Sequence, residues 1–217
     1  MAGKTKRYTS DPIDVTYEAR RCIHAAECVR GLAAVFDTAQ RPWIQPANAG
    51  PDAVADVVTR CPTGALHFER NDGGAAEAVP TTNRIVVTAG GPLHVRGDVK
   101  LVIGDETVTD TRMALCRCGR SANKPFCDNA HKASGFSADG LFTTGTTAAD
   151  YASEPLTITA FPNGPLGLRG QFELISADGA TVFQGTKVTL CRCGGSSNKP
   201  FCDNTHRKIN FTTEAAE

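Results

Sequence analysis

One cysteine pattern, present twice, constrains this chain more than any other feature of its sequence. The spacing is C-x-C-x8-C-x3-H in both copies. The first copy comprises Cys116, Cys118, Cys127 and His131, and the second comprises Cys191, Cys193, Cys202 and His206. The surroundings repeat as well, because the sequence GPL-x-x-R-G at 91–97 returns at 164–170. The chain therefore contains an internal repeat, and both units must fold around the same set of sulfur and nitrogen donors.

The other three cysteines form a third group, again with a nearby histidine: Cys22, His24, Cys28 and Cys61. The total of nine cysteines is odd, and the first residues carry no apolar secretory segment, which argues against a disulfide framework. Units of roughly 65–75 residues seldom stand on an apolar core alone. Because the free energy of metal binding becomes folding free energy, the sequence predicts one metal site per unit.

The spacing also bears on the kind of metal. Thiolates suit both zinc and iron–sulfur clusters. Structural zinc sites more often use C-x2-C, whereas each copy here has C-x-C. A cysteine and a histidine four residues apart can lie on one face of a helical turn. The pattern therefore favours an iron–sulfur cluster and leaves a structural zinc module open as an alternative.

Each copy resembles the CDGSH iron–sulfur motif, C-x-C-x2-[ST]-x3-P-x-C-D-G-[STA]-H. The resemblance covers residues 84–136 and 156–211, and it implies a [2Fe–2S] cluster held by three cysteines and one histidine in each copy. It also implies that the serines and aspartates of the motif are cofactor-binding residues, namely Ser121, Asp128, Ser196 and Asp203. One position departs from the motif, because its glycine is Asn129 in the first copy and Asn204 in the second. Asparagine follows glycine in tolerating left-handed backbone, so we expect the turn to survive.

The resemblance also carries an expectation about the fold. Members of that family with one motif per chain form intertwined homodimers. With two motifs in tandem, one chain can supply both halves, so we expect a monomer with an internal pseudo-dimer. The expected fold class is α+β: a small ferredoxin-like N-terminal domain, followed by two β-rich CDGSH repeats that form a pseudo-twofold intertwined unit.

The N-terminal group, Cys22-x-His24-x3-Cys28 with a distant Cys61-Pro62, resembles divergent single-cluster ferredoxin-like domains. The usual middle cysteine of C-x2-C-x2-C is replaced by Ala25. Two hypotheses follow for the cofactor. His24 is the fourth ligand of a [4Fe–4S] cluster, or three cysteines hold a [3Fe–4S] cluster whose missing corner faces Ala25. A degenerate domain with no cluster is the third alternative.

The expected domains are 1–70 for the ferredoxin-like unit, 71–83 for a linker, 84–150 for the first repeat and 151–217 for the second. Alternation of apolar and polar residues predicts a strand over 13–18, and further strands are expected over 85–87, 99–103, 156–159 and 172–175. Pro51 can open a helix, on whose buried face Cys61 would lie. A short helix is expected to begin near Asp128 and near Asp203, with the aspartate as N-cap.

The net charge and the lack of catalytic motifs limit the classes of function that we expect for this chain. Lys and Arg number 23 and Asp and Glu number 23, so the formal net charge of zero argues against nucleic-acid binding. No apolar run is long enough for a membrane span. No catalytic sequence motif is found, so we expect a protein that is not an enzyme. We expect a cytoplasmic protein that passes single electrons to a redox partner. The alternatives are storage or transfer of [2Fe–2S] clusters to apo-acceptors, or redox and pH sensing.

Overall fold

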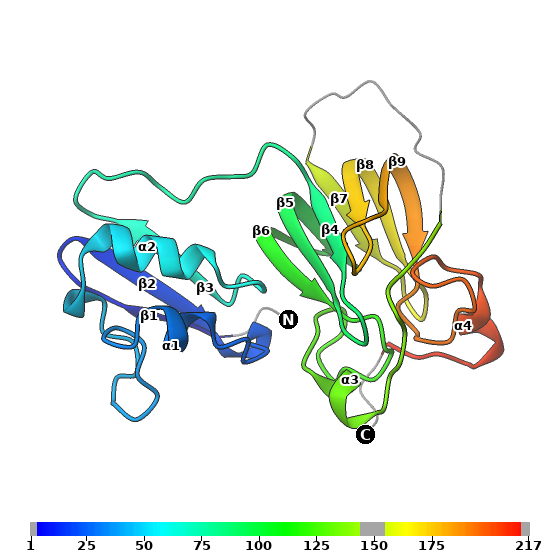
Figure 1. Cartoon of the computed structure of the whole chain (residues 1–217), viewed down its shortest axis with the longest axis horizontal. Coiled ribbons are helices and arrows are strands. Elements are labelled where there is room, and N and C mark those ends of the chain that lie inside the picture. Colours follow the sequence, from blue (N-terminus) through cyan, green and yellow to red (C-terminus); the bar gives the residue numbers. More distant parts are fainter. Residues whose placement is uncertain (1–3, 144–154, 214–217) are drawn as a thin grey trace. The chain divides into compact units, whose positions relative to one another are not determined.

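The computed structural model describes residues 4–143 and 155–213. It divides into two compact units, Met1–Ala78 and Val79–Glu217, which are described here one at a time. Both contain strands and short helices, so the chain has the predicted α+β class (Figure 1). The expected boundary between the repeats, at residues 150 and 151, lies outside the described residues. Among the described helices, none has both the length and the apolar character needed to cross a membrane.

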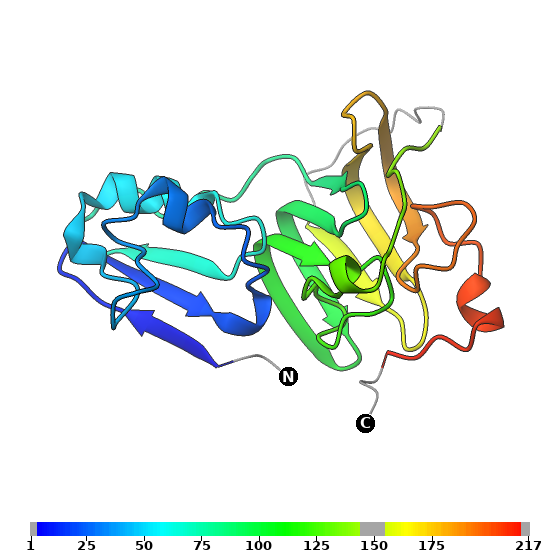
Figure 2. The same cartoon turned by 60° about the horizontal axis from the view of Figure 1, so that its bottom comes forward.

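The first unit is a three-stranded antiparallel sheet covered by helices (Figures 1 and 2). Its strands are β1 (Thr5–Tyr8), β2 (Ile13–Glu18) and β3 (Leu66–Arg70), in the order β1-β2-β3. Its helices are α1 (Glu27–Gly31) and α2 (Pro51–Thr59), with two 3-10 turns at Ala19–Arg21 and Pro46–Asn48. The strand predicted over 13–18 is confirmed, and its alternating residues reach the core. That core also receives the buried face of α2.

The expectation that Cys61 lies on the buried face of α2 is wrong. The helix ends at Thr59, and Cys61 follows it as a half-buried residue packed at the edge of the core. The amide of Cys61 bonds the carbonyl of Val58 at 3.0 Å, a tighter turn than an α-helix makes. Pro62 is the physical reason, because a residue that precedes proline is disfavoured in the α conformation.

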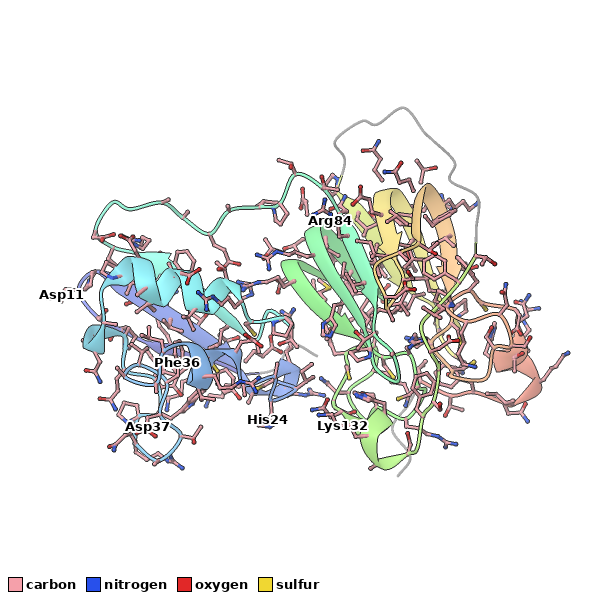
Figure 3. All side chains as sticks on the ribbon, viewed as in Figure 1. Asp11, His24, Phe36, Asp37, Arg84 and Lys132 are labelled. Atoms are coloured by element: carbon pink, nitrogen blue, oxygen red, sulfur yellow. The ribbon has the colours of Figure 1, made fainter. Side chains whose placement is uncertain are left out.

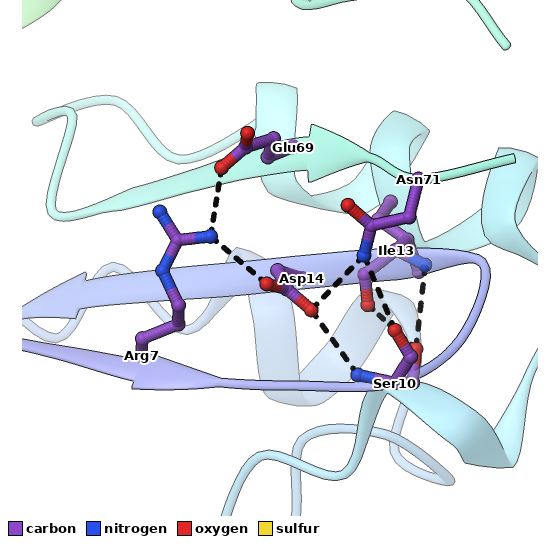
Figure 4. A network of polar contacts seen from close by, with 6 residues as sticks. All are labelled: Arg7, Ser10, Ile13, Asp14, Glu69 and Asn71. Atoms are coloured by element: carbon purple, nitrogen blue, oxygen red, sulfur yellow. Dashed lines mark hydrogen bonds and ion pairs between the residues drawn. The ribbon is translucent and has the colours of Figure 1, made fainter. Parts of the chain in front are cut away.

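A polar network joins all three strands of the first unit (Figure 4). The Nη1 atom of Arg7 donates to Asp14 at 2.9 Å and to Glu69 at 2.7 Å. The other carboxylate oxygen of Asp14 accepts from the Ser10 amide and from Asn71, both at 3.2 Å. Burial by itself raises the pKa of Asp14, but the hydrogen bond from Arg7 and the two others outweigh it and leave that pKa below its usual value. The carboxylate of Asp14 thus fixes the register of β1, β2 and the end of β3.

The second unit is a six-stranded sheet built from both repeats. Its strands are β4 (Arg84–Val87), β5 (Leu93–Ile103), β6 (Glu106–Leu115), β7 (Leu156–Ala160), β8 (Leu166–Ile175) and β9 (Val182–Leu190). The predicted strands all fall inside these elements. β5 and β6 form one antiparallel hairpin, and β8 and β9 form another. Their inward residues, together with those of β4 and β7, make one apolar core.

The first strand of each repeat pairs with the long strands of both repeats. β4 pairs antiparallel with β5 of its own repeat and parallel with β8 of the other. β7 in turn pairs antiparallel with β8 and parallel with β5. Each long strand can hold two partners on one edge because they pair with different segments of it. On β5, β4 takes 93–96 and β7 takes 99–102. The two repeats are therefore parts of one sheet, and neither has a complete sheet of its own.

Each repeat ends in a single helical turn, α3 (Ala130–Ala133) or α4 (Thr205–Lys208). The predicted short helices are confirmed, but the predicted caps are wrong. The residues at the N-cap are Asn129 and Asn204, with φ of 71° and 67°. The left-handed turn expected for these asparagines is thus present, and it places each N-cap one residue beyond the aspartate. Asp128 bonds the amide of Ala130 at 2.9 Å, and so stabilises the turn from outside the helix.

Candidate metal centres

In the first repeat, the loop that follows β6 brings the four predicted donors together as two pairs. The sulfurs of Cys116 and Cys118 lie 3.7 Å apart, and the sulfur of Cys127 lies 3.5 Å from Nδ1 of His131. Backbone bonds of 2.8 Å, from Cys116 to Pro125 and from Cys127 to Ala114, align the two segments that carry these pairs. All four donor residues are buried.

The distances within the pairs match tetrahedral coordination. Two sulfurs bound at about 2.3 Å to one tetrahedral metal lie about 3.8 Å apart, and a sulfur and an imidazole nitrogen lie about 3.5 Å apart. Among the described residues, no three His, Cys, Asp or Glu side chains converge on one point as they would around a single ion. The first repeat therefore presents two pairs of candidate donors, one of two sulfurs and one of a sulfur and a nitrogen.

The protonation states of Cys116 and His131 suit metal binding. A hydrogen bond with Cys118 lowers the pKa of Cys116 to about 6, so one thiolate of that pair is available at neutral pH. The same hydrogen bond raises the pKa of Cys118, while burial raises that of Cys127 to about 11. Burial lowers the pKa of His131, which favours the neutral imidazole that binds metal. Backbone amides point at the sulfurs, since Arg120 and Asn129 each donate to one at 3.4 Å.

The second repeat reproduces this geometry. Cys191 and Cys193 lie 3.7 Å apart, and Cys202 lies 3.5 Å from Nδ1 of His206. A hydrogen bond with Cys193 lowers the pKa of Cys191 to about 6. Of these donors Cys191 and His206 are buried, whereas Cys193 and Cys202 are half-buried. The two candidate centres thus have the same kinds of donor in the same arrangement, and they differ in how far the donors are exposed to solvent.

The loops of the two repeats meet between the centres. The backbones of Cys118 and Cys193 form an antiparallel bridge. The next residue on each side is a glycine with left-handed backbone, φ 77° at Gly119 and 78° at Gly194. A Cβ atom on Gly119 would lie 2.3 Å from the carbonyl oxygen of Cys193, and one on Gly194 would lie 2.5 Å from that of Cys118. Only glycine fits where the loops approach this closely.

Two buried arginines, which sequence reasoning missed, lie inside the C-x-C segments. Arg117 donates to the carbonyls of Gly91 at 3.1 Å and Thr88 at 2.5 Å, and its Nη1 has no hydrogen-bond partner among the described residues. Arg192 makes the matching bonds to Gly164, at 3.0 Å, and to Phe161. The signal was present in the sequence, because both copies read C-R-C.

Burial lowers the pKa of both arginines, and that of Arg192 falls to about 10. The charge of Cys191 acts against the shift at Arg117, and the charge of Cys116 acts against it at Arg192. The negative charge on the first cysteine of each repeat therefore acts on the guanidinium of the other repeat. A buried cation in that position favours negative charge on the neighbouring sulfurs.

The serines and aspartates predicted to bind cofactor shape the loops in this structure. Ser121, which is buried, donates to the carbonyl of Phe126 at 2.7 Å and accepts from the amide of Asn123 at 3.0 Å. Ser196 makes the equivalent bonds, to Phe201 at 2.7 Å and from Asn198 at 3.1 Å. Asp203, like Asp128, accepts from two loop amides, those of Ser197 at 2.9 Å and Thr205 at 3.0 Å. These contacts hold the segments that carry the donors.

In the first unit, the predicted donors surround a cavity of about 450 Å³, which is lined by Cys22, His24, Cys28 and Cys61 among others. Burial raises the pKa of Cys28, and the charges of Cys61 and Cys22 add to the rise. The three sulfurs are therefore close enough to interact electrostatically. Burial raises the pKa of Tyr17, which sequence reasoning missed, and a hydrogen bond with Cys22 adds to the rise. His24 is exposed on the loop before α1 (Figure 3).

Comparisons with known proteins agree with this layout. Residues 8–71 match the family model described as a divergent 4Fe-4S mono-cluster. Residues 90–132 and 163–207 match the model described as an iron-binding zinc finger of CDGSH type. The predicted order, a single-cluster domain followed by two CDGSH segments, is therefore confirmed.

Two curated relatives are similar to the first unit. They are the "Uncharacterized protein YjdI" of Escherichia coli strain K12 and the protein of the same name from Escherichia coli O157:H7. Each is 36% identical over 68 residues, which is 31% of this chain and 90% of the relative. No solved structure matches the chain significantly.

Proposed function

The chain belongs to the proteins that join a divergent 4Fe-4S mono-cluster domain to CDGSH-type iron-binding segments, and from this premise we propose that it carries single electrons to and from a redox partner. The observation that carries the proposal is the pairing of donors. Each repeat offers one pair at 3.7 Å and one at 3.5 Å, which suits two adjacent tetrahedral irons.

We assign one [2Fe–2S] cluster to each repeat, held by three cysteines and one histidine. A bound cluster of this kind supplies a one-electron couple. The protein's own part is to fix the donors, to direct backbone amides at the sulfurs and to place a buried guanidinium near them. Hydrogen bonds and positive charge near the sulfurs both raise a cluster's reduction potential.

For the first unit we propose a [4Fe–4S] or a [3Fe–4S] cluster in the cavity lined by Cys22, Cys28 and Cys61. His24 lines the same cavity, which supports it as the fourth ligand of a [4Fe–4S] cluster. Its exposure, and Ala25 in the place of a middle cysteine, support the [3Fe–4S] alternative. The two alternatives differ by one iron atom per chain.

We also propose that the second unit is a pseudo-twofold intertwined pair of repeats within one chain. The reciprocal pairing of β4 with β8 and of β7 with β5 supports this. The bridge between Cys118 and Cys193 lies where the axis would pass. All nine cysteines are free of disulfides, which suits a reducing compartment such as the cytoplasm.

The deciding experiment counts iron, zinc and acid-labile sulfide per chain in full-length protein purified without oxygen. Eight irons with eight sulfides support two [2Fe–2S] clusters and one [4Fe–4S] cluster. Seven irons support [3Fe–4S] in the first unit, provided that an anaerobic reconstitution with added iron does not restore the eighth. Four irons leave the first unit without a cluster. Two or three zincs without sulfide overturn the proposal and leave a structural zinc module.

Cluster transfer is a second candidate function. The half-buried Cys193 and Cys202 favour it, because a cluster with accessible ligands can pass to an acceptor. Mixing the loaded chain with an apo-ferredoxin separates the two functions. Transfer of intact clusters without free iron supports donation, whereas electron exchange with retention of all iron supports the carrier function.

A further inference from the structure

The two centres of the second unit differ in how far solvent reaches their sulfurs. In the first repeat, Cys118 is 7% exposed and Cys127 is 3% exposed. Their equivalents in the second repeat, Cys193 and Cys202, are both half-buried. Because electron exchange between proteins needs close approach, the second centre is the one that a partner can reach more easily.

A hollow of about 590 Å³ opens onto Cys193, and both repeats contribute to it. One wall is the loop of the first repeat from Gly119 to Ala122, with Lys124. The other wall is the C-terminal segment at 209–212. The hollow therefore connects Cys193 of the second centre to a surface that the first repeat helps to build.

The residues around this hollow depart from the repeat symmetry. Arg120, which is exposed, stands where the second repeat has Gly195. Ile209, whose side chain is 50% exposed, stands where the first repeat has Ser134. Lys124 lies with its Nζ 6.0 Å from the ring of Phe211. Lys124 has an equivalent in Lys199, so two of these three positions are asymmetric. The hollow gains one cation, Arg120, and one exposed apolar side chain, Ile209, at positions whose counterparts are a glycine and a serine.

The charge extends beyond the hollow. Arg207 and Lys208 are exposed on α4, the turn that also carries His206. Asp203 lies beside this turn, and its carboxylate is engaged by the loop amides of Ser197 and Thr205. Asp128 lies beside the hollow and accepts from the amide of Ala122, one of its lining residues, at 2.7 Å. The rim is cationic, although the chain as a whole has no net charge. Such a rim attracts an acidic surface and speeds its approach.

We propose that this hollow is the docking surface for an acidic patch on the redox partner, and that electrons enter and leave the second unit through the centre of the second repeat. The inference rests on the proposed electron-carrier function. The occupant is a partner protein whose carboxylates meet Arg120 and Lys124 and whose apolar centre meets Ile209. In each exchange, one electron leaves the reduced centre and one acceptor on the partner gains it.

The test follows the oxidation of the reduced full-length chain in a stopped-flow instrument at low ionic strength. Hexacyanoferrate(III) is the anionic acceptor, taking one electron per ion, and hexaamminecobalt(III) is the cationic one. In the parent, the fastest phase belongs to the second repeat, so Cys193→Ser should remove or alter it. Arg120→Gly, which copies the residue of the other repeat, should slow that phase about three- to tenfold with hexacyanoferrate(III) and should not slow it with the cobalt complex.

An acidic polypeptide then tests whether the surface takes a protein. Poly-L-glutamate should slow the fast phase of the parent severalfold by covering the hollow, and it should have much less effect on Arg120→Gly. Poly-L-lysine should have no effect on either. If hexacyanoferrate(III) responds to Arg120 but poly-L-glutamate does not compete, the hollow admits small anions only and the docking proposal is overturned.

Two controls keep the result interpretable. Lys100→Gln removes the same charge from β5, well along the strand from the centres, and should leave the rates at the parent value. Arg120→Lys keeps the charge and should keep the rate, which separates the effect of charge from a loss of folding. Iron and sulfide contents are measured on every variant. Full contents with equal rates in Arg120→Gly and the parent would overturn this inference alone, whereas a parent without iron would overturn the proposed function.

Discussion

The backbone of Cys118 pairs with the backbone of Cys193, so the second donor of one centre is held by the second donor of the other. Each cysteine's carbonyl lies against a glycine of the opposite repeat, Gly119 or Gly194. The loops that carry the two sets of candidate donors therefore pack directly against each other.

The first prediction concerns those glycines. Gly119→Ala or Gly194→Ala should lower the stability of the second unit by about 2 kcal/mol or more, because the new Cβ meets a backbone oxygen and the left-handed backbone is strained as well. The iron content should fall at both centres, since the contact is shared. Thermal unfolding and iron analysis measure these effects.

Gly179→Ala is the matched control for that experiment. Gly179 also has a left-handed backbone, with φ 72°, but a Cβ there would meet nothing within 4 Å. The control should cost about 1 kcal/mol, the strain alone, and keep its iron. Equal losses of stability in Gly179→Ala and Gly119→Ala would mean that the contact between the loops does not contribute to the stability of the second unit.

The second prediction concerns the buried serines. Ser121→Ala removes two hydrogen bonds of the loop between Cys118 and Cys127 and leaves the carbonyl of Phe126 without that donor. We expect a loss of about 1–2 kcal/mol in stability, together with faster loss of iron from the first repeat. Ser137→Ala changes an exposed serine of the same repeat and is the control. A variant whose loss of iron matches the parent's would show that the loop holds its shape without Ser121.

The third prediction concerns the histidine donors. Replacing His131 or His206 by cysteine exchanges a neutral donor for a thiolate, which adds negative charge to the centre and should lower its reduction potential. The same change should shift the loss of the cluster in acid to lower pH, because protonation of the imidazole no longer competes with iron. Potentiometric titration and visible absorption between pH 5 and 8 measure the two effects. Variants with the parent's potential and acid stability would exclude both histidines as ligands.

The fourth prediction concerns Asp14 in the first unit. Its pKa is lower in the folded chain than its usual value, so its contribution to stability is present above the unfolded pKa of about 3.9 and is lost as the pH falls through the folded value. Asp14→Asn should therefore destabilise the unit at pH 7, by about 1 kcal/mol, and reduce the loss of stability in acid. Trp43 is the single tryptophan of the chain and lies at the core of this unit, so its fluorescence reports unfolding there.

Asp56→Asn is the control for Asp14. Asp56 forms an ion pair with Arg60 on the exposed face of α2. Because exposed pairs of this kind contribute little, the control should unfold close to the parent at both pH values. A parent whose unfolding midpoint is unchanged between pH 7 and pH 3 would contradict the role given to Asp14.

The sequence alone predicted the donors and the repeat, because the identity of a metal ligand and its spacing are local properties of the chain. The strands around GPL-x-x-R-G were predictable for the same reason, since alternation of apolar residues is a local signal. Local signals failed where neighbouring residues compete, as at Cys61, where Pro62 ends the turn, and at Asn129, which takes the cap position that Asp128 was expected to hold.

Only the tertiary structure decided how the two repeats are joined and how they differ. The pairing of β4 and β7 with the hairpin of the other repeat, and the bridge between Cys118 and Cys193, are contacts between residues distant in sequence. No local pattern encodes them, because they depend on how two complete units pack. The greater exposure of Cys193, compared with Cys118, has the same origin: nearly identical motifs receive different surroundings from the chain that follows them.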